Sequence, residues 1–471
     1  MTVAEKSSSV KAEKIERDFL SRLSDHPHIL NAIFAASRYA TLLKAEKVSP
    51  LWQHAISMST VWPQLWHRNK KSIPMWRTLA VRLESLKPEL CDQMKNKVRC
   101  SHYRAAHIVQ SNIQQIFEGE MKRLHRYNIP GLKTEMVRVN EKNVHIYNPT
   151  RNEIRVVNRW TFDVVKVLNH RHYFDMQLSE RFLAVKLKTD EIIIYDVDNY
   201  ELIQTIENQN PNYPRPHEFC LADDVLASVS ASNSRLGFML SLRRLNAETG
   251  VFPTEPQKNS YFVAETPLLR RHLAIYCDEK FLVLDMYRTN SRKKPMRAFM
   301  VFNLRSWRLI RSCSFERCEP LYDRVKRECN SGVIVLDNNT NNTKPQPSLV
   351  AWNVGNGTLR PINSSFLPSI ATQILYTGAV SHNQQNQYMF RSFVDGKISF
   401  SAFSSDNWRD SSRYPNARRM NHAYEHLSGL GLDAYRPGSF LTCHSKIIHF
   451  DGAQLIFLGE NSDLNIIDYV E

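Results

Sequence analysis

The chain has 471 residues, of which 42% are hydrophobic and 23% are charged, a composition typical of folded rather than disordered protein. Such a length exceeds one ordinary hydrophobic core unless that core is built from repeats. The formal net charge of +15 favours acidic partners. Because the basic residues are scattered along the chain, the sequence disfavours nucleic acid as the main ligand.

The N-terminal 25 residues alternate charges and lack an apolar run, so no secretory signal peptide is expected. No segment approaches the roughly 18 consecutive apolar residues of a membrane span. We therefore expect a cytoplasmic or nuclear protein without a membrane partner.

The eight cysteines form no C-x-x-C pair, and the closest two are Cys313 and Cys318. Zinc sites require two close Cys pairs, or a Cys pair followed by a His pair. The sequence therefore predicts no metal site and no cofactor, and it favours reduced thiols that pack as small hydrophobic groups.

Up to about residue 127 the spacing of apolar residues is helical. Ile29, Leu30, Ile33 and Phe34 form one apolar stripe on a helix. Two further short helices are predicted after it, and longer helices are predicted over residues 75–126. Residues 1–22, which precede the stripe, are predicted to be a flexible tail.

After residue 131 the period changes to two, and one unit recurs. An apolar strand ends in an aromatic or aliphatic residue and Asp or Asn, and a polar turn and a second apolar strand follow. Copies end at Asn148, Asp196, Asn246, Asn303, Asn353 and Asp468, and a degenerate copy spans residues 398–403. Their spacing is roughly 50 residues, which suits four-stranded blades. The sequence thus predicts an all-β propeller of about seven blades over residues 131–471, in preference to a pair of β-sandwiches.

The ends of these units resemble the closing signature of WD repeats. Tyr195-Asp196, Phe302-Asn303 and Trp352-Asn353 stand where that family usually has Trp-Asp. No Gly-His dipeptide opens the repeats, so the resemblance is to a divergent WD-repeat-like propeller without the family's usual buried His–Asp network.

Residues 23–67 resemble an F-box, with residues 68–130 as a helical linker to the propeller. The order follows the family pattern: a Pro before an apolar stripe, a Leu-Leu pair, Val-x-x-x-Trp and an apolar-Trp pair. His26 stands where a Leu usually precedes the Pro. The matching residues are Pro27, Ile29, Leu30, Ile33, Phe34, Leu42, Leu43, Val48, Trp52, Trp62 and Leu65.

The resemblance implies a multidomain substrate-recognition adaptor of an SCF-type ubiquitin ligase. The F-box-like module would dock on a Skp-family adaptor, and through it on a cullin–RING ligase, by placing apolar helix anchors in a groove. The propeller would bind an acidic or phosphorylated protein substrate, because Arg forms bidentate bonds to such groups. Candidate substrate-binding residues are Arg243, Arg244, Arg292 and Arg297.

Two alternatives stay open from the sequence. The F-box-like residues could simply pack against the helices that follow them. The whole chain could be a propeller scaffold, or a nucleic-acid or RNP-binding protein, without a ligase role.

Motifs that would indicate catalysis are absent. The sequence contains no Walker A loop, no G-x-S-x-G and no H-E-x-x-H. The densest histidine cluster, His170-Arg171-His172, is expected to lie in a loop or on the surface. We therefore expect a non-catalytic subunit rather than an enzyme, with no catalytic residues.

Overall fold

The structure is a computed structural model. It describes residues 26–37, 39–72, 74–98, 100–118, 122–189, 191–207, 218–231, 237–263, 268–277, 280–289, 295–316, 333–337, 349–353, 359–361, 372–377, 387–394, 397–404, 447–450, 453–458 and 463–470. The chain divides into two compact units, residues 1–114 and 115–471, and each is described by itself. The predicted tail at residues 1–22 and the candidate Arg292 lie outside the described residues.

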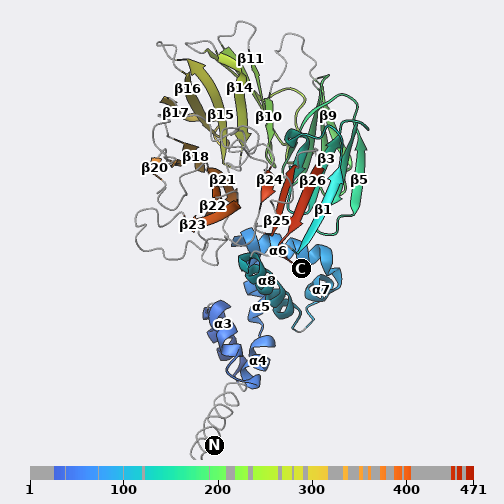
Figure 1. Ribbon diagram of the computed structural model, residues 1–471, viewed down its shortest axis with the longest axis vertical. Coiled ribbons are helices and arrows are strands. Elements are labelled where there is room, and N and C mark those ends of the chain that lie inside the picture. The colour runs from blue at the N-terminus through green and yellow to red at the C-terminus, as the bar shows by residue number, and fades with distance from the viewer. Residues whose placement is uncertain are drawn as a thin grey trace, which may run out of the picture. The chain divides into compact units, whose positions relative to one another are not determined.

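Seven helices lie in the described part of the chain before residue 119, at the blue end of the ribbon in Figure 1. They are α2 (Pro27–Ala36), α3 (Tyr39–Glu46), α4 (Pro50–Ser57), α5 (Val61–Ser72), α6 (Pro74–Leu86), α7 (Pro88–Lys95) and α8 (Ser101–Glu118). Four of these helices begin at proline, which suits the first helical position because no backbone donor is needed there. Ser49 caps α4, since its side chain accepts a hydrogen bond from the Trp52 amide at 3.3 Å.

Aromatic contacts join the F-box-like helices to the helices that follow them. Trp66 on α5 meets Trp76 on α6 in a T-shaped pair with centroids 5.9 Å apart. Trp62 meets Tyr103 on α8 in the same geometry at 5.2 Å. Trp62 and Trp76 are almost fully buried, so these contacts form the core of the N-terminal unit.

The described part of residues 115–471 forms seven antiparallel sheets. Sheet 1 consists of β2 (Val137–Val139), β3 (Asn143–Asn148), β4 (Glu153–Asn158) and β5 (Val164–Asn169), and sheet 2 of β6 (Tyr173–Leu178), β7 (Phe182–Leu187), β8 (Ile192–Asp196) and β9 (Leu202–Ile206). Sheet 3 consists of β10 (Glu218–Leu221), β11 (Val225–Ala231), β12 (Gly237–Arg244) and β13 (Lys258–Val263), and sheet 4 of β14 (Leu268–Cys277), β15 (Phe281–Thr289), β16 (Pro295–Asn303) and β17 (Arg308–Glu316).

The remaining sheets complete the unit. Two have three described strands each: β18 (Val333–Asp337), β19 (Leu349–Asn353) and β20 (Leu359–Pro361), and β21 (Thr372–Thr377), β22 (Gln387–Val394) and β23 (Lys397–Ser404). The closing sheet joins β1 (Arg123–Asn128) to β26 (Asp463–Asp468), β25 (Gln454–Leu458) and β24 (Ile447–Phe450). Pairing of the first strand with the last three closes a propeller ring and leaves few open edges.

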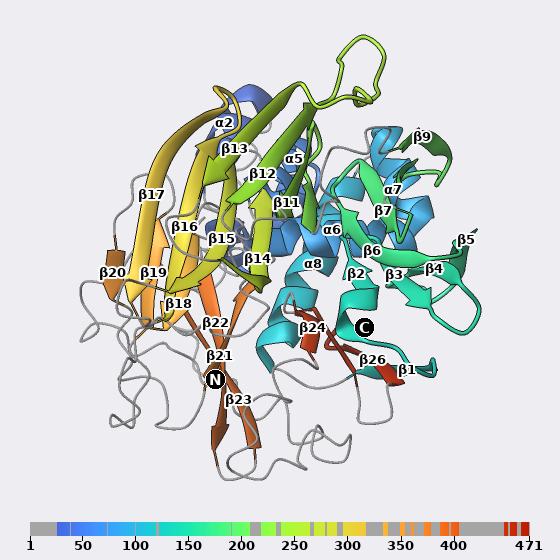
Figure 2. The same ribbon diagram turned by 90° about the horizontal axis from the view of Figure 1, so that it is seen from above.

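The sheets are arranged radially (Figure 2), with β24 as the innermost strand of the closing sheet and β2, β6, β10 and β14 as the innermost strands of sheets 1–4. Innermost strands of neighbouring sheets are in contact: β24 with β2, β2 with β6, β6 with β10, and β10 with β14. Apolar side chains fill the space between sheets; Ile154 and Val156 of sheet 1, for example, pack with Met176 and Val185 of sheet 2. Strand order and packing together confirm the predicted β-propeller. Its blade number stays a prediction, because residues 405–446 lie outside the described residues.

Two predictions about boundaries are corrected. The sequence assigns residues up to 130 to a helical linker, whereas Arg123–Asn128 is β1, paired with a strand some three hundred residues later along the chain. The repeat copy ending at Asn148 is also out of register with the later copies. Asn148 lies between the second and third strands of sheet 1, and the copy that matches Asp196 ends at Asn158, between the third and fourth.

Candidate functional site

The F-box-like residues divide into a buried set and an exposed set. Phe34 is 2% exposed, and Leu42, Trp62 and Leu65 are buried with it in the core of the N-terminal unit. Ile29, Ile33 and Val48, in contrast, are exposed by 42%, 45% and 63%. Leu30, Leu43 and Trp52 are half-buried, and Pro27 begins α2. One set is therefore packed in the core of the N-terminal unit, the other set stays exposed on it, and docking on an adaptor stays a prediction.

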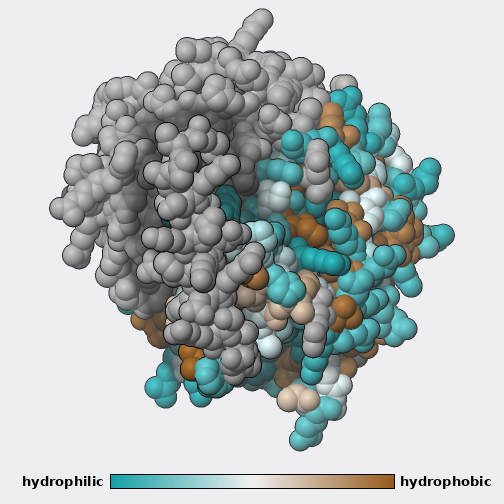
Figure 3. Space-filling model, turned by 90° about the horizontal axis from the view of Figure 1, so that it is seen from below, coloured by the Kyte–Doolittle hydropathy of each residue, from teal (hydrophilic) through white to brown (hydrophobic). Residues whose placement is uncertain are grey.

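Further exposed apolar side chains come from the same short helices. Leu51 on α4 and Met58 directly after it are exposed, as are Ile29 and Ile33 one turn apart on α2. Large exposed apolar side chains that gather on one small module are typical of protein interaction surfaces. Figure 3 shows apolar surface lying among hydrophilic surface on one side of the molecule.

Polar contacts hold these helices in a defined arrangement. The Asn31 Oδ1 atom accepts hydrogen bonds from the Ser59 hydroxyl at 2.6 Å and from the Thr60 amide at 3.1 Å, which ties α2 to the start of α5. The Trp62 indole donates to the Ile56 carbonyl at 2.6 Å. The exposed apolar groups therefore sit on a fixed scaffold, as preorganised binding requires.

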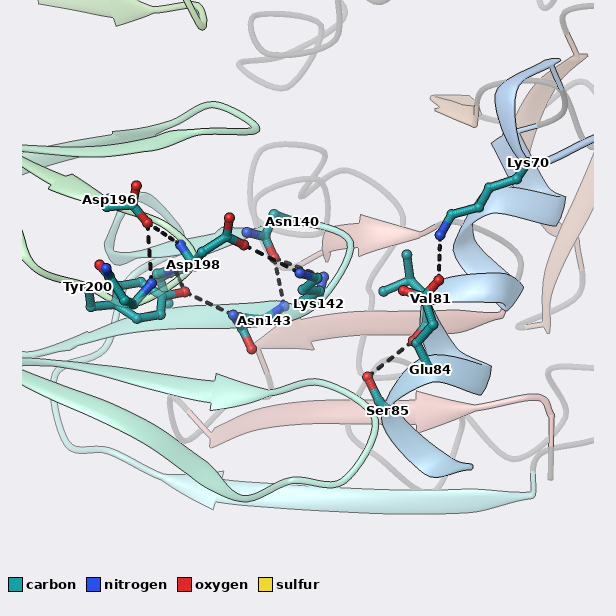
Figure 4. Close-up of polar contacts among 12 residues, drawn as sticks. Lys70, Val81, Glu84, Ser85, Asn140, Lys142, Asn143, Asp196, Asp198 and Tyr200 are labelled. Atoms are coloured by element: carbon teal, nitrogen blue, oxygen red, sulfur yellow. Dashed lines mark hydrogen bonds and ion pairs between the residues drawn. The ribbon is translucent and has the colours of Figure 1, made fainter. Parts of the chain in front are cut away.

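Ion pairs link the helices of the N-terminal unit as well. Lys70 on α5 bonds Glu84 on α6, and the Ser85 hydroxyl donates to the Val81 carbonyl within α6 at 3.1 Å (Figure 4). His107 on α8 lies 3.1 Å from the Glu46 carboxylate at the end of α3.

In the propeller, the recurring Asp or Asn forms the same turn in four consecutive sheets, between the third and fourth strands. Its side-chain oxygen accepts hydrogen bonds from backbone amides two or three residues later, at 2.7–3.4 Å. Its carbonyl accepts from the amide four residues later, at 2.8–2.9 Å. The four residues are Asn158, Asp196, Asn246 and Asn303. Such Asx turns explain why the sequence repeats these residue types.

The residue four positions after each Asx has a positive φ angle, between 56° and 68°. These residues are Phe162, Tyr200, Gly250 and Trp307. Bulky side chains rarely adopt this conformation, so the surrounding contacts must stabilise it. In each of these turns an aromatic residue reaches the preceding sheet.

Tyr200 shows this contact most fully. Its hydroxyl, in the turn of sheet 2, accepts a hydrogen bond from the Asn143 side chain and lies 2.9 Å from His145 Nε2, both on β3 of sheet 1 (Figure 4). Burial lowers the pKa of His145 to about 3 and raises the pKa of Tyr200. A neutral His145 can therefore accept a hydrogen bond from the Tyr200 hydroxyl, and this buried network joins two blades. The sequence does not mark this network, because no Gly-His dipeptide contains His145.

The other junctions use aromatic stacking. Trp307 of sheet 4 lies under the Arg244 guanidinium of sheet 3, with the charge centre 4.8 Å from the ring centroid. Phe252 of sheet 3 meets Phe182 of sheet 2 at 5.7 Å. Phe162 of sheet 1 stacks on His125 of the closing sheet at 3.3 Å.

One of the candidate substrate-binding arginines, Arg244, takes part in these junctions, whereas Arg243 bonds within its own sheet. The Arg243 guanidinium donates to the Thr254 carbonyl at 3.1 and 3.2 Å, and burial lowers its pKa. Arg244 donates to the Leu304 carbonyl of the next sheet and stacks on Trp307. Both are engaged in contacts within the propeller, and Arg297 lies in β16.

The two histidines of the predicted loop cluster lie in a connection between sheets 1 and 2. His170 is buried, and its Nε2 atom lies 3.0 Å from the Tyr195 hydroxyl. His172 is exposed, with a φ angle of 64°. The predicted loop is confirmed, with His170 buried in it and His172 exposed.

Among the described residues, no group of three or more His, Cys, Asp or Glu side chains could hold a metal ion. Within the described part of the chain, Cys91 and Cys220 are buried free thiols, and Cys100, Cys277 and Cys313 are half-buried free thiols. No helix of the described residues is long and apolar enough to cross a bilayer.

Comparison with known proteins finds distantly similar solved structures but no matching family. No protein-family model and no curated protein sequence matches the chain. One solved structure, titled "Crystal Structure of Mitotic Checkpoint Complex", is similar with a TM-score of 0.40 and 12% identity, over 75% of this chain and 93% of that one. Another, "Structure of the Neurospora crassa Pan2 WD40 domain", has a TM-score of 0.34 and 8% identity, over 54% and 71%. Likenesses this distant carry no argument, so the class of β-propeller protein rests on the strand order and packing.

Proposed function

We propose that the chain is the substrate-recognition adaptor of an SCF-type ubiquitin ligase. The F-box-like helices α2–α5 dock on a Skp-family adaptor, and the propeller binds the protein substrate. The chain itself is non-catalytic: it raises the effective concentration of a substrate lysine near the loaded ubiquitin enzyme. The helices α6–α8 space the two binding functions.

The observation that supports this proposal is the division of the F-box-like residues. Phe34, Leu42 and Trp62 stabilise the module, while Ile29, Ile33 and Val48 stay exposed on it. Large apolar side chains that stay exposed on one small module are available to the surface of a partner. Helix-borne anchors at one-turn spacing, as on α2, suit recognition in the groove of a partner.

The test is co-purification of the Skp-family adaptor and cullin with the full chain. The double variant Ile29→Asp/Ile33→Asp introduces charge where apolar groups should be buried, and we expect adaptor recovery to fall by about tenfold or more. Val98→Asp is the matched control, because Val98 is equally exposed but lies outside the F-box-like segment. Unchanged recovery with the double variant, or equal loss with the control, would refute the docking.

The scaffold or RNP alternative is supported by the net charge of +15. It predicts binding to nucleic acid with an affinity that falls steeply with salt, since phosphate binding releases counterions. Filter binding of the full chain to RNA at 50 and 200 mM salt measures this directly. Absent or salt-insensitive binding would exclude it.

A further inference from the structure

One end of sheets 1 and 2 carries an exposed aromatic side chain on an innermost strand. Phe174 on β6 is 51% exposed. It lies at an irregularity in the pairing of β6 with β7, because Tyr173 pairs with Leu187 and Asp175 pairs with the adjacent Lys186. Phe174 is thus the extra residue of a β-bulge, a feature that redirects a side chain away from the regular ladder.

The Phe174 ring lies next to a buried positive charge. Lys186 is only 2% exposed, and its ammonium nitrogen is 4.5 Å from the ring centroid. This geometry is a cation–π contact. It leaves the exposed part of the ring as an apolar platform with a positive charge beside it.

Exposed basic side chains come from three neighbouring segments at the same end. The Lys188 amide donates to the His172 carbonyl, and the His170 amide donates to the Asn152 carbonyl, both at 2.7 Å. These bonds bring the turn of β3–β4, the connection into β6 and the turn of β7–β8 together. Their exposed cationic side chains are Arg151, Arg171 and Lys188, with His172 beside them.

Two of the described carboxylates near this surface pair with arginines. Asp175 accepts a hydrogen bond from Arg138 at 2.7 Å, and Glu153 accepts one from Arg155 at 2.6 Å. Glu153 also lies 4.0 Å from the Arg151 guanidinium, and Glu191 keeps its charge while it accepts a hydrogen bond from the Thr189 hydroxyl at 2.8 Å. Among the described residues here, the exposed cations Arg151, Arg171 and Lys188 outnumber this one carboxylate without an arginine partner. The field at this end is therefore positive, and it favours an anionic partner.

We propose that this surface, formed by Phe174, Arg151, Arg171, His172 and Lys188, binds an anionic linear peptide. Carboxylates or phosphates of the peptide pair with the cations, and one apolar peptide side chain packs on Phe174. A single exposed aromatic suits a peptide with one apolar anchor, whereas single-stranded RNA needs successive stacking platforms. The inference builds on the proposed function, since it specifies the substrate that the propeller half selects.

The experiment measures fluorescence anisotropy with the full chain and labelled twelve-residue probes. One peptide has Asp and Glu flanking a central Leu, a second replaces the acids with phosphoserine, and a third replaces them with Asn and Gln. A uridine dodecamer is the fourth probe. We expect both anionic peptides to bind at least about tenfold more tightly than the neutral peptide and the RNA. Tighter binding of the phosphoserine peptide would assign the anion as phosphate, and equal binding would show that carboxylates suffice.

Variants connect binding to this surface. We expect Phe174→Ala and the pair Arg171→Glu/Lys188→Glu each to weaken binding by at least about fivefold. Arg308 is an exposed arginine of sheet 4 at the other end of the propeller from the proposed surface. The control variant Arg308→Glu should therefore leave binding unchanged. Equal binding of the neutral peptide, preference for RNA, or equal losses in Arg308→Glu and the surface variants would overturn the proposal. No Skp-family adaptor is present in this assay, so its failure is distinct from failure of the docking.

Discussion

The buried His145 makes the stability of the propeller depend on pH in a direction that can be worked out. Burial lowers the pKa of His145 to about 3, whereas an unfolded chain has the ordinary value of about 6.5. Between these values the unfolded state binds a proton that the folded state does not. Stability from this group is therefore fully present above about pH 6.5 and falls as the pH is lowered toward 3.

The magnitude at pH 5 follows from the difference of about 1.5 units between this pH and the unfolded pKa. At about 1.36 kcal/mol per unit, acidification to pH 5 costs roughly 2 kcal/mol of unfolding free energy through His145 alone. The variant His145→Gln removes the titrating group and keeps a neutral hydrogen-bonding side chain near the Tyr200 hydroxyl. It should be less stable at pH 7 but should lose about 2 kcal/mol less between pH 7 and pH 5.

Urea unfolding at pH 7 and pH 5, followed by near-ultraviolet circular dichroism, gives for each protein the loss of unfolding free energy between the two pH values. All other groups titrate in both proteins. The loss of unfolding free energy between pH 7 and pH 5 in the parent protein, minus the same loss in the variant, therefore reports on His145 alone. The same pH dependence in the variant and the parent protein would refute the assignment of a neutral, buried His145.

Three further outcomes are expected from the structure, each measured as a free energy of unfolding in urea. Gly250→Ala should lose about 1 kcal/mol through its φ of 68° alone, because a Cβ there would meet nothing within 4 Å; no loss would contradict the left-handed turn. Asn303→Ala should lose about 1 kcal/mol with its Asx turn, whereas Asn303→Asp, which keeps the acceptor, should lose much less. Phe34→Asp should destabilise the N-terminal unit by about 3 kcal/mol or more, while Ile33→Asp stays within about 0.5 kcal/mol; similar losses would show that Ile33 is not exposed.

The propeller was predictable from sequence because its turns use local chemistry. An Asn or Asp that bonds amides two or three residues later leaves the same short signature in four consecutive sheets. The same locality explains the register error in sheet 1. Both Asn148 and Asn158 follow apolar strands and accept hydrogen bonds from the next amides, so the pattern cannot tell one turn of a sheet from the next.

Strand β1 was not predictable in this way, because its partner is remote. The segment Arg123–Asn128 contains Arg123, His125 and Arg126, and the helix that precedes it in the chain, α8, ends at Glu118. Only β26 makes it a strand: the Arg126 Nε atom donates to Asn465 Oδ1 at 3.1 Å, across most of the propeller sequence. Charges of this kind also protect an outer strand from pairing with other chains.

In the F-box-like helices, the sequence predicts the apolar stripe but not which of its residues are buried. Helical spacing places Ile29 and Ile33 next to Leu30 and Phe34 in one wide stripe. Tertiary packing then decides which half of the stripe is buried, and the structure assigns Phe34 to the core and Ile33 to the surface. A disruption test chosen from the sequence alone would target Phe34 and would confuse loss of folding with loss of docking.

The two ends of the propeller differ in their contacts, and this separates Arg243 and Arg244 from the proposed peptide surface. At the end with the Asx turns, each junction runs from one sheet to the preceding one. The ring is closed by a junction of the same direction: Arg159 of sheet 1 donates to the Gln454 side chain of the closing sheet at 2.7 Å. Arg244 belongs to this structural end. At the other end of sheets 1 and 2, Arg171 and Lys188 remain exposed beside Phe174, so a partner can bind there without breaking a contact that holds the blades together.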